Sequence, residues 1–433
     1  MKKLLFTTTF LLNSIALLGQ NYTSYFTGNE TDFSGNPIGG VCMMGGASEN
    51  DEAMKWFLQR AAGGDILVLR ASGSDGYNEY MYEELGVNVN AVETIVFNEA
   101  SAADENYVQN KIAQAEGIWI AGGDQWNYIS YWRNNSIANL INEAVTDRNI
   151  VIGGTSAGMA ILGGVYYSAE NGTVSSSEAL MNPFHQNMTV DNTPFLSISF
   201  LDEVITDTHY DNPDRRGRHV AFLSRMYTDN GINAKGIACD EYTAVCIDPS
   251  GVASVYGDAP EEDDNAYFIQ INCENELVGP ETCVANSPLD WNRESAALSV
   301  YQIKGTNNAS NTFDLNDWKT GTGGEWKHWY VDNGNLMELA ATAPNCLGLS
   351  IEENNVSTTF TFYPNPTAND LQVSFSDNKL KKVSVYSTDR RLLMSQHTMG
   401  YHMILPLRDL VSGIYVLEVE NENGINARLF TKQ

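Results

Sequence analysis

Basic residues are scarce in this chain. Among 433 residues there are 25 Lys and Arg against 54 Asp and Glu, so the formal charge is −29. A chain this acidic repels nucleic acid and anionic membrane surfaces, and we expect neither as a partner. The hydrophobic fraction of 43% is nevertheless large enough for a substantial buried core, which excludes a wholly disordered chain.

Long apolar runs are missing beyond the first twenty residues. Lys2 and Lys3 precede a short apolar stretch that ends near Gly19 and Gln20, which is typical of a secretory signal peptide over residues 1–20. No later segment approaches the roughly 20 continuous apolar residues that a membrane-spanning helix needs. We therefore expect an exported chain without membrane insertion.

Metal-binding motifs are missing as well. The sequence has neither a CxxC pair nor an HExxH motif, so we expect no metal and no cofactor. The acidic run Glu261–Asp264 could supply oxygen ligands to calcium, but a solvated loop is the preferred interpretation.

Cysteines are few and even in number. Six cysteines in an exported chain permit disulfides, although their connectivity does not follow from the sequence. Cys273 and Cys283 flank a short loop and are our first choice of pair. Free buried thiols are the alternative for Cys42 and Cys239.

What the sequence does contain, from about Gly40, is an alternation of short apolar strands and amphipathic helices. This alternation predicts an α/β fold with a parallel sheet covered on both faces. Functional sites in such sheets form at the carboxyl ends of the strands. Strands are expected at residues 39–47, 65–72, 92–98, 117–123 and 149–154, and helices at 49–64, 104–117, 126–148 and 156–164.

The composition changes after Cys346. Residues 347–360 are polar and predict a linker, whereas residues 361–433 contain short alternating strands that predict a small all-β domain. The expected organisation is therefore a signal peptide at 1–20, a catalytic domain at 21–346, the linker, and the β domain.

One serine stands between glycines where a strand turns into a helix. Ser156 lies in "GGTSAG", which fits the G-x-S-x-G pattern of a nucleophile elbow, and the apolar strand before it supplies the required context. A serine hydroxyl needs a base, and His209 follows an apolar strand end with Asp207 two residues earlier. The base needs an acidic orienter, for which a bend carrying Asp240 and Glu241 is the candidate.

The turn "AGGDQ" ends the central strand and is a candidate oxyanion site. Its two glycines let the backbone approach a ligand, and free amides at a helix start suit a developing negative charge. A plain strand–helix turn is the alternative. The candidate amides are those of Gly123 and Asp124 and, after the serine, Ala157.

Together these motifs resemble the cyanophycinase and dipeptidase E family of serine peptidases, particularly its cyanophycinase branch. The resemblance runs from about Gly40 to Asp248 and rests on "GGA", "AGGDQ", "GGTSAG", "DTHY" and "GIACDEYTA", in the order Ser…His…Glu. It implies a class I glutamine-amidotransferase-like three-layer sandwich with a mostly parallel sheet. Ser156 would be the nucleophile, His209 the base and Glu241 its orienter.

The resemblance also implies that Gln125, Asp207 and Arg218 contact substrate. Since a guanidinium offers a bidentate fork to a carboxylate, we expect Arg218 to anchor a substrate carboxylate. Arg215 and Arg216 are interpreted as solvated loop charges.

The sequence departs from the family pattern in several places. Thr208 stands where the family usually has Gln, Pro213 where it commonly has Arg, and the segment from Glu261 to Trp329 is long and aromatic. Peptidase chemistry is therefore a safer expectation than cleavage of the β-linked aspartyl-arginine polymer itself.

The tail has a resemblance of its own. "FYPNPT", "VSVYST" and "GIYVLEV" resemble the C-terminal sorting domain of the type IX secretion system of Bacteroidota. This implies the type IX machinery as a partner, export through the periplasm of a Gram-negative bacterium, and a secreted or cell-surface location. The alternative is a generic β-sandwich attachment module.

The expected function is therefore that of a secreted serine exopeptidase that hydrolyses peptide bonds, with β-aspartyl or cyanophycin-like bonds as candidate substrates. An esterase-like serine hydrolase and a catalytically decayed peptide-binding protein are the alternatives. Whether the chain forms a homodimer is left open.

Overall fold

In the computed structural model, the chain divides into two units, the first ending at Asn345 and the second beginning at Cys346. The predicted signal peptide lies outside the described residues, as do residues 347–359 of the predicted linker. The structure describes residues 21–33, 35–345, 360–375, 378–387, 391–408, 410–421 and 424–433.

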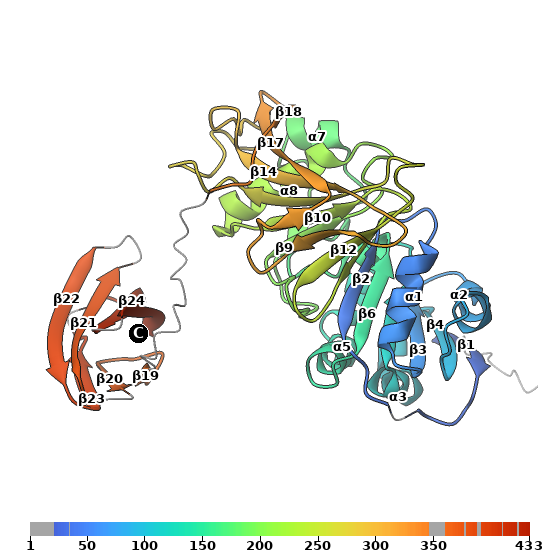
Figure 1. The fold of residues 1–433 in the computed structure, drawn as a ribbon, viewed down its shortest axis with the longest axis horizontal. Helices are drawn as coiled ribbons and strands as arrows, with labels where there is room; N and C mark the ends of the chain where they lie inside the picture. The colour runs from blue at the N-terminus through green and yellow to red at the C-terminus, as the bar shows by residue number, and fades with distance from the viewer. Residues whose placement is uncertain are drawn as a thin grey trace, which may run out of the picture. The chain divides into compact units, whose positions relative to one another are not determined.

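A ten-stranded mixed sheet forms the centre of the first unit (Figure 1), in the order β1-β4-β3-β5-β6-β2-β11-β12-β15-β16. The run from β4 to β2 is parallel, and the strands on either side are antiparallel. The strands are β1 (Tyr22–Gly28), β2 (Gly40–Met44), β3 (Asp65–Arg70), β4 (Ala91–Phe97), β5 (Gly117–Ile120), β6 (Val151–Thr155), β11 (Ala244–Ile247), β12 (Val252–Tyr256), β15 (Asn311–Asp314) and β16 (Gly321–Thr322).

Helices cover both faces of this sheet. In β3, Ile66 and Val68 share a buried cluster with α1, whereas Leu67 and Leu69 share one with α3 and α5. Such burial of both faces is what a parallel sheet requires, and the predicted α/β class is confirmed. The helices are α1 (Asp51–Arg60), α2 (Gly76–Glu79), the π-helix η1 (Tyr80–Glu84), the 3₁₀ helix η2 (Ala100–Asp104), α3 (Asn106–Gln114), α4 (Gln125–Trp132), α5 (Ser136–Thr146), α6 (Ala157–Ala160), α7 (Ser176–Met181) and α8 (Arg216–Asn230).

The segment from 261 to 329, to which the sequence assigned no role, supplies strands to the two larger sheets of this unit. The second sheet has six strands in the order β18-β17-β14-β13-β10-β9, and a two-stranded sheet pairs β7 with β8. These strands are β9 (Val204–Asp207), β10 (Lys235–Cys239), β13 (Asn265–Ile271), β14 (Leu298–Lys304), β17 (Gly324–Asp332), β18 (Asn335–Ala340), β7 (Tyr166–Tyr167) and β8 (Val190–Asp191).

Two predicted helices differ from those observed. The expected helix at 126–148 is divided into α4 and α5, because the Asn135 side chain accepts a hydrogen bond from the Ile137 amide and so starts a new helix. The expected helix at 156–164 is limited to the single turn of α6.

The predicted disulfide between Cys273 and Cys283 is wrong. Cys273 is disulfide-bonded, but Cys283 is a free, buried thiol whose Sγ lies 3.6 Å from Ser224 Oγ of α8. Cys42 and Cys239 are free and buried, which confirms the alternative stated for them.

The second unit is all-β, as predicted. Its alternating strands bury one side each, so that Leu371, Val385, Leu405 and Leu417 meet in one core. Among the described residues of either unit, no helix combines the length and the apolar character that crossing a membrane demands. The strands form two sheets, β19 (Phe360–Tyr363) with β20 (Asp370–Phe375) and β23 (His402–Pro406), and β22 (Leu392–Met399) with β21 (Leu380–Ser387), β24 (Gly413–Asn421) and β25 (Gly424–Lys432).

Candidate active site

Ser156 occupies a strained turn between β6 and α6. Its φ of 51° and ψ of −118° are costly for a residue with a side chain, by about 1–3 kcal/mol. The turn is tight because a Cβ on Gly158 would lie 2.0 Å from the Ile120 carbonyl oxygen, so only glycine fits there. The small residues around Ser156 are therefore required by the close approach of β5.

His209 follows β9 and faces Ser156. Its Nε2 lies 2.8 Å from Ser156 Oγ, and its Nδ1 lies 2.6 Å from Glu241 Oε1. His209 too has a positive φ, of 46°, and its amide donates to the Gly45 carbonyl at 2.8 Å. A hydroxyl, an imidazole and a carboxylate in series are what activation of a serine requires.

Glu241 lies in the turn between β10 and β11. Its amide donates to Asp211 Oδ1 at 2.9 Å, and Asn212 Nδ2 donates to its Oε2 at 3.3 Å. The hydrogen bond with His209 is the main cause that holds the pKa of the Glu241 carboxyl below its usual range. Glu241 is therefore suited to stabilise a positively charged imidazole.

The loop after β2, at Gly45 and Gly46, packs against His209 and the turn that carries Glu241. A Cβ on Gly46, whose φ is 111°, would lie 2.5 Å from both Cε1 and Nε2 of His209. The Gly46 carbonyl accepts from the Tyr242 amide at 3.1 Å, next to Glu241. The glycine loop thus contacts both the His209 ring and the turn that carries Glu241.

The predicted oxyanion amides lie at the same edge of the sheet. A Cβ on Gly122 would lie 3.5 Å from Ser156 Cβ, which shows how closely the "AGGDQ" turn approaches the serine. Within the described part of the chain, the amides of Gly123, Asp124 and Ala157 donate to no protein group. The Asp124 side chain is engaged, because it accepts from the Trp126 amide at 3.0 Å and caps α4.

Asp207 and Arg218 form a buried bidentate ion pair. Arg218 donates from Nε to Oδ2 at 2.8 Å and from Nη2 to Oδ1 at 2.5 Å, and its Nη1 faces Thr173 and Val174. Burial raises the pKa of Asp207, but the Arg218 charge and hydrogen bond outweigh it and the net pKa is lowered. In the structure, Nε and Nη2 of Arg218 are therefore occupied by Asp207, and a contact between Arg218 and a substrate carboxylate stays a prediction.

Gln125, the third predicted substrate-binding residue, also has a protein partner. Its Nε2 donates to the Tyr167 carbonyl at 2.8 Å. Gln125 begins α4 directly after the oxyanion turn, so this bond ties the turn to β7.

The sequence predicts Arg215 to be a solvated charge, but the structure places it differently. It is half-buried, and its Nη1 donates to the Thr208 carbonyl, next to His209, at 3.0 Å. Among the described residues no carboxylate pairs with it, whereas Arg216 pairs with Asp214 and Glu338. Burial, followed by the Arg218 charge, lowers the pKa of Arg215. A half-buried guanidinium beside the base that pairs with no carboxylate among the described residues is a candidate anion binder, and no local sequence pattern distinguishes Arg215 from its neighbours.

Asp240 precedes Glu241 and is buried, with 3% of its surface exposed. Its Oδ2 accepts from Asn265 N at 3.1 Å and Nδ2 at 3.0 Å, but its Oδ1 has no hydrogen-bond partner among the described residues. Burial raises the pKa of Asp240 to about 7, and the nearby carboxylates of Asp211 and Asp264 add to this.

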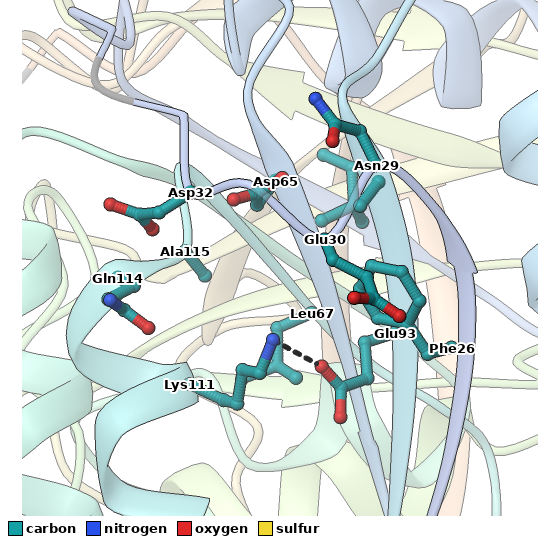
Figure 2. Close-up of a pocket in the computed structure, with 12 residues that line it drawn as sticks. Phe26, Asn29, Glu30, Asp32, Asp65, Leu67, Glu93, Lys111, Gln114 and Ala115 are labelled. Atoms are coloured by element: carbon teal, nitrogen blue, oxygen red, sulfur yellow. Dashed lines mark ion pairs between the residues drawn. The ribbon is translucent and has the colours of Figure 1, made fainter. Parts of the chain in front are cut away.

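A pocket of about 130 Å³ lies at the opposite, amino-terminal end of the parallel strands (Figure 2). Lys111 of α3 points toward Glu93 of β4, with Nζ 2.9 Å from Oε2, and Asp32 and Asp65 also line the pocket. This pocket is separate from Ser156, which follows the carboxyl end of β6. No group of three or more His, Cys, Asp or Glu in the described ranges is arranged to hold a metal ion.

Comparison with known proteins agrees with the resemblances derived from the sequence. Residues 45–255 match the description Peptidase family S51, and residues 361–432 match the Secretion system C-terminal sorting domain. Both resemblances are confirmed by these matches.

Several similar curated proteins are cyanophycinases. The one from Synechococcus elongatus is 24% identical over 225 residues, which are 50% of this chain and 65% of that protein. That from Trichormus variabilis is 23% identical over 227 residues, covering 50% of this chain and 70% of the relative. That from Geminocystis herdmanii is 25% identical over 228 residues, covering 50% and 77%.

Two solved structures were also found to be similar. A peptidase from an acI-B1 Actinobacterium has a TM-score of 0.41 at 14% identity, covering 65% of this chain and 98% of that one. A putative Peptidase E protein from Listeria monocytogenes has a TM-score of 0.34 at 13% identity, covering 51% and 99%.

We predict that Asp240→Asn removes part of the pH dependence of stability. The unfolded carboxyl titrates near 3.8 and the folded one near 7, so between these values only the folded state retains the proton. Asp240 should therefore contribute a fall in the free energy of unfolding of the wild type as the pH rises from about 4 to 7, of at most about 4 kcal/mol at ~1.4 kcal/mol per unit. The Asp240→Asn variant should lose this contribution to the pH dependence of the free energy of unfolding, which is measured by urea unfolding at a series of pH values.

Glu116→Gln is the matched control. Burial also raises the pKa of Glu116 to about 7, but its Oε2 accepts from the Asp65 amide, far from Ser156 along the strands. The prediction would be contradicted if the free energy of unfolding changed with pH to the same extent in the wild type and in Asp240→Asn between pH 4 and 7.

Proposed function

Since residues 45–255 carry a domain of peptidase family S51 and residues 361–432 a secretion sorting domain, we propose that this chain is a secreted serine peptidase with Ser156 as nucleophile. The single observation that carries the proposal is the unbroken series from Ser156 Oγ through His209 to Glu241, at 2.8 and 2.6 Å. Because the alignment spans 65% of the first cyanophycinase, substrate and activity are part of the proposal.

The proposed reaction begins when Ser156 Oγ attacks a peptide carbonyl carbon. His209 Nε2 takes the hydroxyl proton, and the Glu241 carboxylate stabilises the resulting imidazolium through Nδ1. The carbonyl oxygen becomes negatively charged and accepts from the free amides of Gly123, Asp124 and Ala157. His209 then gives its proton to the leaving amine, and water hydrolyses the acyl-serine by the same steps.

For the substrate, we propose a peptide with a free carboxylate that Arg215 binds. Support comes from its half-buried guanidinium, which lies beside the carbonyl that precedes His209 and pairs with no carboxylate in the part of the chain that the structure describes. Acidic or β-aspartyl peptides cleaved near their C-terminus fit this requirement. Asp207 and Arg218 would then shape the wall of the pocket through their ion pair, with Gln125 fixing the neighbouring turn.

Export is the second part of the proposal. The sorting domain supports secretion or cell-surface attachment, and we propose that a signal peptide at residues 1–20 directs the chain through the periplasm to the type IX machinery. An esterase-like hydrolase would use the same serine. Incubating the full chain with aspartyl dipeptides, cyanophycin and an aryl ester separates these activities from a peptide-binding protein without catalysis.

We predict that Ser156→Ala retains the fold but lowers the rate of hydrolysis by about 10⁴–10⁶-fold, since the variant lacks the hydroxyl that attacks the peptide carbonyl. The rate on the best peptide and the melting temperature are measured together. An alanine variant with near wild-type turnover would show that Ser156 serves packing alone.

We predict that Gly46→Ala lowers kcat by at least about 10²-fold with a smaller change in KM, because its Cβ would displace the His209 ring from Ser156. Gly63→Ala is the matched control. Its φ of 85° carries similar backbone strain, but a Cβ there has no heavy atom closer than 3.9 Å. Equal kinetic losses in both variants would mean that strain, and not the contact with His209, is responsible.

We predict that a chain ending at Ile351 keeps full activity in vitro but reaches neither the cell surface nor the medium. The division between the units at Asn345 and the match of residues 361–432 motivate this. Activity of the purified chain and its amount in each cell fraction are measured. Loss of folding on truncation would show that the β unit belongs to the catalytic unit.

We predict that Arg215→Lys raises KM for peptides with a free C-terminus by about tenfold or more, because the planar fork is lost while the charge remains. Amidated peptides should be poor substrates for the wild type and unaffected by the substitution. Arg216→Lys is the control, since that side chain is already paired with Asp214 and Glu338. Equal rates on free and amidated peptides would refute a carboxylate-binding role.

A further inference from the structure

We propose that Cys42 and Cys246 form a disulfide in the exported protein, a cross-link between the two strands that lead to the candidate active site. Their sulfur atoms lie 3.5 Å apart, and both residues are buried, at 0% and 1% exposure. A sulfur–sulfur bond is about 2.05 Å long, so a small rotation of the two side chains closes the remaining distance.

The register of β2 and β11 suits such a bond. Cys42 and Cys246 are direct partners in this antiparallel pair. Gly45 and Thr243 follow the pair Met44 and Ala244 at one end of the ladder. The Gly45 amide donates to the Thr243 carbonyl at 2.9 Å, so Gly45 and Thr243 form a hydrogen-bonded pair. Because hydrogen-bonded and non-hydrogen-bonded pairs alternate, Cys42 and Cys246 form a non-hydrogen-bonded pair, in which the Cα atoms are about 4.5 Å apart. That separation lies within the range of about 4.4–6.8 Å that a disulfide requires.

The other free cysteines lack this arrangement. Cys239 and Cys283 are also buried, but across the described ranges no hydrogen bond joins either sulfur to a second thiol, and Cys283 contacts the Ser224 hydroxyl instead. The proposal is therefore specific to one pair among four free thiols.

The oxidation needs an electron acceptor, which we identify as the disulfide of an exported thiol oxidoreductase. One thiolate of the pair attacks that disulfide, and the second then displaces the carrier, so that the two cysteines lose two protons and two electrons and the carrier becomes a dithiol. Burial raises the pKa of the Cys246 thiol, with the neighbouring Cys42 adding to it, so the thiolate is scarce in the folded protein. The bond accordingly forms while the chain folds, before β2 and β11 are covered.

The cross-link would act where the candidate triad is supported. β2 leads directly into the Gly45–Gly46 loop, whose Gly45 carbonyl accepts from the His209 amide, and β11 follows the turn that carries Glu241. A covalent bond between them closes a loop across 204 positions of the sequence. Closing so long a loop restricts the unfolded chain and stabilises the pairing of the two strands.

Peptide mapping of the full chain after export tests the proposal. The protein is denatured without reductant in the presence of N-ethylmaleimide, and the modified fraction of each cysteine is measured by mass spectrometry. We expect Cys239 and Cys283 to be modified, and Cys42 and Cys246 to be unmodified and joined in one cross-linked peptide. Modification of Cys42 and Cys246 to the same extent as Cys239 would overturn the proposal.

Single substitutions give an independent readout, since the mapping is done on denatured protein and does not require a stable variant. In Cys42→Ala, Cys246 should become modified by N-ethylmaleimide. In the control Cys239→Ala, which removes a thiol of similar burial, the cross-linked peptide should persist. Loss of the cross-linked peptide in Cys239→Ala, or an unmodified Cys246 in Cys42→Ala, would contradict the proposal.

Discussion

The candidate site depends on Gly45 and Gly46, because the lack of side chains at these two residues lets other segments pack directly against their backbone. Three segments that are distant in the sequence meet there: the end of β2, His209 after β9, and the turn with Glu241 before β11. Gly45 O binds the His209 amide, Gly46 O binds the Tyr242 amide, and the His209 ring lies where a Gly46 side chain would be. Any side chain at this point would separate the imidazole from its partners.

Strain is concentrated at the same place. Ser156, His209 and Tyr242 have φ values of 51°, 46° and 62°, a region that residues with side chains seldom adopt. Such strained conformations persist only where contacts with the surrounding structure hold them in place. Here β6 and β5 hold Ser156 from one side, and the buried ion pair of Asp207 and Arg218 holds the end of β9 from the other.

The sequence was sufficient to predict the parallel strands, the serine turn and the β tail, because each has a local signal: an apolar run, glycines of fixed spacing, or alternation. It could not predict what depends on distant partners. The pairing of Cys273 and the contrast between Arg215 and Arg218 both follow from which side chain another segment brings near. Arg218 meets Asp207 because α8 packs against β9, and no pattern around Arg218 reveals that contact.

The position of β2 in the sheet has a consequence for when the site can exist. β2 is the second strand in the chain, yet it lies between β6 and β11, whose residues 151–155 and 244–247 are synthesised much later. Contacts over such separations are late events in folding, because the loop entropy must be overcome first. A nascent chain therefore cannot bring Ser156, His209 and Glu241 together until residue 247 has emerged.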